Sequence, residues 1–188
     1  MSEKTITQKE DAMTQRDIRM EDMKKRYAKF TEMKLSKQAF VDTRLSEHAR
    51  DLYNVIGNGV SEDPELKPSI DTVEGFNVHY VGAERGKGAA LHSHTTVEVF
   101  FAMSGKWSVY WGENGENNIE LETFDIISIP PGVMRGFKNI GNEYANLMAI
   151  LGGNNPGKIS WAKSVLERAE KSGLRLDSSG KIIELNSQ

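Results

Sequence analysis

The distribution of hydrophobic positions changes along the chain. Residues 1–40 are rich in charge, and their apolar side chains recur at helical spacing, at Met13, Met20, Met23, Tyr27 and Phe30. This pattern predicts a helix with one narrow apolar stripe. Such a stripe is too thin to stabilise a helix in isolation, so we expect it to pack on the rest of the chain or on a partner subunit.

Two further helices are predicted. The segment SEHARDLYNVIG, residues 46–57, favours a short helix with Ser46 as N-cap and Gly57 as C-cap. Residues 160–172 favour a second helix that Gly173 closes. Residues 175–183 then predict a terminal hairpin or an extended tail.

Between residues 76 and 151 the pattern becomes one of short alternating runs separated by turn residues, namely FNVHYV, ALHSHTTVEVFFAM, KWSVYW, NNIELE, DIISIP, RGFKNI and ANLMAIL. Many short strands at this spacing are typical of an antiparallel sandwich or barrel. We therefore expect a mostly β protein with a helical arm over residues 1–57, a barrel over 58–155, and a C-terminal helix and tail over 156–188 that pack on the barrel.

The amino-acid composition limits the kinds of ligand and partner that the protein can have. The formal net charge of -3 gives no electrostatic case for nucleic acid or an anionic membrane. Because the chain has no cysteine, any metal must be held by nitrogen and oxygen. No window approaches the apolar run of about 18 residues that a membrane span needs. The charged N-terminal residues lack the apolar stretch of a secretory signal, so we expect a cytoplasmic location.

Candidate chemistry gathers at His92, His94 and Glu98. On an unbroken strand these even-numbered residues share one face. Two imidazoles and one carboxylate suit a single divalent ion, Fe(II), Mn(II), Zn(II) or Ni(II), and leave coordination positions open. The alternative, solvent-facing polar residues on an amphipathic strand, is harder to sustain for two histidines in phase with an acid.

The same segment resembles the cupin superfamily. Residues 86–105 match the first cupin motif, G(X)5HXH(X)3E(X)6G, at every fixed position. The second motif, G(X)5PXG(X)2H(X)3N, is matched at Pro130, Gly132 and Asn139, whereas Phe124 replaces the glycine and Arg135 the histidine. The resemblance covers about residues 75–152. It implies a small jelly-roll β-barrel, one internal metal and frequent dimerisation, and we expect a homodimer.

Arg135 departs from the family pattern, in which that histidine is the remaining metal ligand. Arginine stays protonated and cannot ligate. In the preferred interpretation, Arg135 faces the cavity and binds a substrate anion or stabilises an oxyanion, which makes it the candidate catalytic and substrate-binding residue. In a second, Arg135 pairs with Glu98 and the site is metal-free. In a third, Arg135 points outward and His79 completes the coordination sphere.

Two aromatic residues are further candidates for substrate binding. Phe100 shares parity with Glu98, although a buried aromatic side chain is more often core. Alternation puts either Tyr110 or the pair Trp107 and Trp111 inward, and we take Tyr110 as the candidate. The expected function is a mononuclear metal-dependent enzyme of dioxygenase type acting on a small, carboxylate-bearing molecule. A Lewis-acid isomerase or lyase, a non-catalytic binding or sensing cupin, and an interaction protein built on the N-terminal arm are alternatives.

Overall fold

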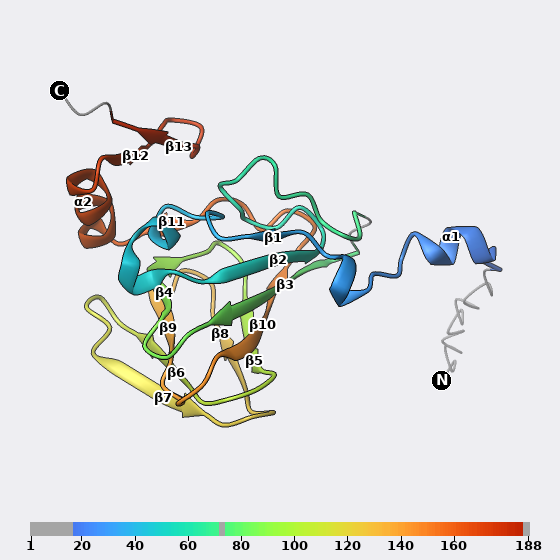
Figure 1. The fold of residues 1–188 in the computed structure, drawn as a ribbon, viewed down its shortest axis with the longest axis horizontal. Coiled ribbons are helices and arrows are strands. Elements are labelled where there is room, and N and C mark those ends of the chain that lie inside the picture. The colour runs from blue at the N-terminus through green and yellow to red at the C-terminus, as the bar shows by residue number, and fades with distance from the viewer. Residues whose placement is uncertain (1–16, 72–73, 186–188) are drawn as a thin grey trace, which may run out of the picture.

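Side chains along the strands of the barrel alternate between buried and more exposed positions. In β10 (Ala145–Gly152) every second side chain is buried, because successive residues of a strand point to opposite faces. The computed structural model describes residues 17–71 and 74–185, in which two antiparallel sheets enclose one core (Figure 1). The expected mostly β, jelly-roll fold is confirmed.

The larger sheet has six strands in the order β1-β2-β3-β10-β5-β8. Their bounds are Leu35–Ser36, Asp51–Ile56, Phe76–Ala83, Ala145–Gly152, Glu98–Ala102 and Ile126–Ile129. The smaller sheet has five strands in the order β11-β4-β9-β6-β7. Their bounds are Ser160–Trp161, Gly88–Ser93, Arg135–Asn139, Trp107–Trp111 and Asn117–Leu121. Buried side chains from both sheets, including Phe100, Trp107, Phe137 and Leu147, pack between them.

The predicted helix over residues 46–57 is wrong. Only a 3-10 turn, η3 (Ser46–His48), forms there, and β2 follows it. Leu52 and Val55 are buried, and β2 pairs along β3 with a bulge near its end. Tertiary pairing therefore outweighs the local helical pattern. Strands β1 and β2 lie before residue 58 and belong to the barrel sheet, while the proposed domain bounds remain a prediction.

The long N-terminal helix is also wrong for the residues described, and Met13 lies outside them. Helix α1 spans only Met20–Lys24 and buries no side chain. Figure 1 shows it apart from the barrel. Met20 is 71% exposed and Tyr27 is 63% exposed. Phe30, in η1 (Phe30–Glu32), reaches the barrel, where its ring centroid lies 5.0 Å from that of Tyr53.

The predicted C-terminal helix and hairpin are present, but the helix begins at Lys163 because Ser160 and Trp161 pair with β4 as strand β11. Helix α2 (Lys163–Lys171) buries Val165 and Ala169 and is followed by Gly173, whose φ of 79° suits a helix end. A hairpin of β12 (Leu174–Leu176) and β13 (Ile182–Glu184) follows. η2 (Asp42–Arg44) completes the elements. Within the two described ranges, neither α-helix combines the length and apolar character needed to cross a membrane.

Candidate metal centre

The chain changes sheet between the two histidines and the glutamate. β4 ends at Ser93 and β5 begins at Glu98, so the predicted unbroken strand is wrong. The three side chains can meet because residues 94–97 carry the chain from the smaller sheet to the larger one, and both sheets face the same core. All three are buried, and one ligating atom from each lies within 4.8 Å of the others. Among the described residues, this is the group that can surround one ion.

Both imidazoles are neutral and have lone pairs available. The Nδ1 atom of His92 lies 2.7 Å from the carbonyl oxygen of Ala90, which can only accept, so Nδ1 carries the proton and Nε2 is free. Burial, followed by the charge of Arg135, holds the pKa of His92 well below its usual value. The same two causes lower the pKa of His94 to about 3. Among the residues that the structure describes, none forms a hydrogen bond with the Nδ1 atom of His94.

Arg135 lies in β9, opposite His92 in the strand register, and is 1% exposed. Its Nε and Nη2 donate to Oε2 of Glu98 at 2.9 and 2.5 Å. Its Nη1 donates to the carbonyls of His92 and Val133. The interpretation in which Arg135 points outward is therefore wrong. Each guanidinium nitrogen already has a protein acceptor.

Glu98 is divided between two partners. Its Oε2 accepts from Arg135, while its Oε1 faces Nε2 of His94 at 3.8 Å. Burial raises the pKa of Glu98, and the charge and hydrogen bonds of Arg135 oppose that rise. Because Arg135 occupies only Oε2, the other oxygen is available to a cation. The donor set of two neutral imidazoles and one carboxylate oxygen therefore fits a divalent ion.

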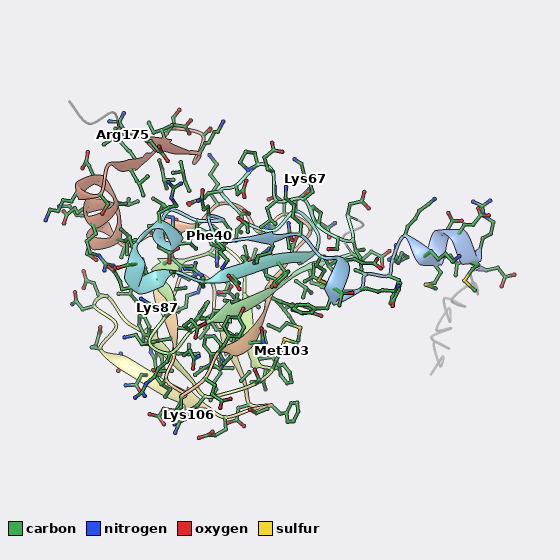
Figure 2. The ribbon with its side chains drawn as sticks, viewed as in Figure 1. Phe40, Lys67, Lys87, Met103, Lys106 and Arg175 are labelled. Carbon is green, nitrogen blue, oxygen red and sulfur yellow. The ribbon has the colours of Figure 1, made fainter. Side chains whose placement is uncertain are left out.

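A cavity of about 30 Å³ lies beside these groups. One water needs roughly 10–15 Å³ in this measure, so the space suits an ion with a very small ligand. Its polar lining comprises Arg50, His79, His92, His94 and Glu98. The apolar lining includes Phe40, Phe137, Ile159 and Trp161. Figure 2 labels Phe40 at the end of the barrel that carries β11, where its ring packs against that of Trp161.

The structure does not bring Phe100 or Tyr110 into this lining. Phe100 is fully buried and packs edge-on against Phe137, as a core residue does. Tyr110 pairs with Gly136 in the register and lies over it on the outer face of the smaller sheet. Its hydroxyl donates to the carbonyl of Ala89 at 2.7 Å. Of the two alternatives left by alternation, it is Trp107 that points inward.

His79 lies in the cavity wall but outside the ligand group. Burial lowers the pKa of His79 to about 4, and no group in the described part of the chain forms a hydrogen bond with its Nε2. A β-carbon at Gly59 would lie 2.0 Å from that nitrogen, so Gly59 makes room for the ring. Sequence reasoning missed Arg50 and Trp161, which belong to no motif and lie far from the histidines in sequence.

Comparison with known proteins agrees with this architecture. Residues 79–151 match the family model of the cupin domain. The polyketide cyclase RemF from Streptomyces resistomycificus is similar in structure, at 12% identity and a TM-score of 0.53, over 71% of this chain and 82% of that chain. A Klebsiella pneumoniae protein with a double-stranded β-helix domain is 23% identical, with a TM-score of 0.44, over 48% of this chain and 77% of that chain.

The DMSP lyase DddQ from Ruegeria pomeroyi is 15% identical, with a TM-score of 0.47, over 58% of this chain and 50% of that chain. No curated protein matches the chain. The family match includes His92, His94, Glu98 and Arg135, and the first motif is complete within it. Residues 79–151 therefore match the cupin domain, and the two antiparallel sheets that carry them form the barrel expected of that domain.

Proposed function

We propose that this cupin holds one divalent ion, Fe(II), Mn(II), Zn(II) or Ni(II), between His92, His94 and Glu98 and acts on a small, carboxylate-bearing molecule. Dioxygenase-type oxidation is the reaction we expect first. The observation that carries the proposal is the buried group of three donors, with ligating atoms within 4.8 Å of one another and both imidazoles neutral. Neutral histidines can bind a cation without first losing a proton.

The chain's own residues have separable roles. A divalent ion bound to this donor set supplies Lewis-acid or redox chemistry at its open positions. Arg135 orients Glu98 by holding Oε2, which leaves Oε1 toward His94. The proton on Nδ1 of His92 is held by Ala90, so its Nε2 faces the site. The apolar lining, with Phe40 and Trp161, keeps bulk water out. This geometry favours a positioning role for Arg135 over the anion-binding role predicted from sequence.

Particular features of the structure also support alternative functions. The ion pair between Arg135 and Glu98 satisfies both groups without a cation, which favours a non-catalytic binding or sensing cupin. A Lewis-acid isomerase or lyase would use the same three donors. The exposed Met20 and Tyr27 support the expected homodimer. The cytoplasmic location and the lack of nucleic-acid or membrane partners remain predictions from composition.

Metal content tests the proposal directly. We expect about one divalent ion per chain in protein purified without added metal or reconstituted with Fe(II), Mn(II), Zn(II) or Ni(II). His92→Ala and His94→Ala should each lose that ion, whereas His48→Ala, a half-buried histidine outside the group, should keep it. Elemental analysis that finds no ion in the wild type after reconstitution would remove the enzyme proposal and leave the binding cupin.

Oxygen consumption then separates the reaction classes. Anaerobic loading with Fe(II), followed by oxygen and a panel of small carboxylates, should give substrate-dependent oxygen uptake if the reaction is of the dioxygenase type. Conversion of a carboxylate without oxygen uptake would instead support Lewis-acid chemistry.

A further inference from the structure

A second guanidinium reaches the cavity. Arg50 immediately precedes β2, and its side chain is 3% exposed. Its guanidinium carbon lies 5.3 Å from the ring centroid of Phe40 and 6.0 Å from that of Phe137. All three residues line the cavity that holds the candidate ligands. The guanidinium therefore forms part of the cavity wall, flanked by two aromatic rings.

Only one nitrogen of Arg50 is used for support. Its Nη1 donates to Oδ2 of Asp42 at 2.9 Å and to the carbonyls of His48 at 3.0 Å and Gly88 at 3.4 Å. Within the described ranges, no protein acceptor bonds to Nε or Nη2. Neither nitrogen is among the buried polar atoms that lack a partner, so both keep some accessible surface. The hydrogen bonds of Nη1 hold the segment before β2 in place, which gives this nitrogen a structural role. The Nε and Nη2 edge of the guanidinium has no such role.

Arg135 shows what such an edge binds. It uses its own Nε and Nη2 to hold one oxygen of the Glu98 carboxylate. The same pair of nitrogens on Arg50 presents parallel N–H groups that match a carboxylate. The fully buried carboxylate of Asp42 already neutralises the charge of Arg50. An anion is therefore attracted to the cavity chiefly when a bound cation adds positive charge there.

The position of Arg50 relative to the ligands supports an anion between them. Arg50 lines the same cavity as His92, His94 and Glu98, so an anion held in that cavity can lie between the guanidinium and the candidate ligands. At roughly 10–15 Å³ for one water, the cavity of about 30 Å³ holds about two to three water-sized groups, so only the smallest carboxylates suit it.

We propose that the Nε and Nη2 edge of Arg50 binds the carboxylate of the substrate, so that Arg50 is the anion-binding residue of this site and the substrate is a carboxylate of very few carbon atoms. This inference rests on the proposed function, because the bound anion is a substrate only if the metal-dependent reaction takes place. The contact between Arg50 and the anion can nevertheless be measured without turnover.

Calorimetric titration with sodium acetate, and with acetamide as the neutral molecule of the same shape, tests the contact in metal-stripped and in metal-loaded wild-type protein. We expect acetate to bind at least about tenfold more tightly than acetamide in the loaded protein, because charge-assisted hydrogen bonds are the strong ones. Arg50→Lys keeps a charge beside Asp42 but removes the planar edge, and it should weaken acetate binding by about tenfold or more.

Arg44→Lys is the matched control, since Arg44 pairs with Glu184 at the surface, and it should leave acetate affinity unchanged. If Arg50→Lys does not fold, the double variant Asp42→Asn/Arg50→Gln removes both buried charges together and should show the same loss. Thermal unfolding identifies the folded variants. Equal affinity for acetate and acetamide in the wild type, or unchanged acetate affinity in a folded Arg50 variant, would overturn the inference.

The metal content of the same samples separates this inference from the proposed function. A wild type that binds metal but shows no dependence of acetate affinity on Arg50 retains the metal centre and loses only the anion site. A wild type that binds no metal, yet binds acetate through Arg50, retains the anion site and loses the metal-dependent enzyme.

Discussion

Replacing Arg135 by methionine would remove the guanidinium while keeping a side chain of similar length. Glu98 is 4% exposed, and in the variant its carboxylate would stay buried without the two donors that now hold Oε2. Removing one partner of a buried ion pair costs about 3–5 kcal/mol. For a chain of this length each kcal/mol lowers Tm by roughly 2–4 °C, so we expect Tm to fall by about 6–20 °C.

Urea unfolding of metal-stripped protein measures this cost. The double variant Glu98→Gln/Arg135→Met should recover most of the lost stability, because it leaves no unpaired charge in the barrel. Adding Zn(II) to the single variant should restore part of the stability, since a cation between His92, His94 and Glu98 supplies the missing counter-charge. A single variant that costs less than about 1 kcal/mol, the value of an exposed pair, would refute the reasoning.

Three further predictions follow from local features. Phe124 is 74% exposed and, among the described residues, is the non-glycine residue with a positive φ, 75°. Glycine adopts this conformation without strain, so Phe124→Gly should raise the free energy of unfolding in urea by about 0.5–1 kcal/mol. Gly132→Ala, at a φ of 77°, should lower the free energy of unfolding by a similar amount. Burial raises the pKa of Glu62 from 4.5 to about 7, so the contribution of Glu62 to stability is complete below pH 4.5, and about 3 kcal/mol of it is lost as pH rises from there through 7. Glu62→Gln should lack this loss between pH 5 and 8, and equal pH profiles of the variant and the wild type would contradict the prediction. Deleting residues 1–28 should convert the expected dimer to a monomer in light scattering, and an unchanged mass would remove the arm from the interface.

Local patterns were enough for much of the fold. Alternation over residues 76–151 predicted a barrel because a strand that separates core from solvent must alternate. The helix at α2 was visible because its apolar stripe and its terminal glycine lie within one short segment. The spacing of His92, His94 and Glu98 identified the candidate ligands, since the cupin motif joins them through a single connection between sheets.

The features of the fold that the sequence did not predict depend on the pairing and register of strands distant in sequence. Residues 51–56 form β2 because β3 offers a partner edge and a core to bury Leu52, neither of which is encoded locally. Which acceptors Arg135 meets, and that Tyr110 faces outward, depend on the register of β9 with β4 and β6.

The amino-acid sequence alone determined the donor types, their spacing and the alternation that builds the barrel, because these act over a few neighbouring residues. Only the tertiary structure decided that Arg135 binds Glu98 and that Arg50 and Trp161 join the cavity wall. Those contacts join residues tens of positions apart, and their energies depend on burial, which exists only once the sheets have closed around the core.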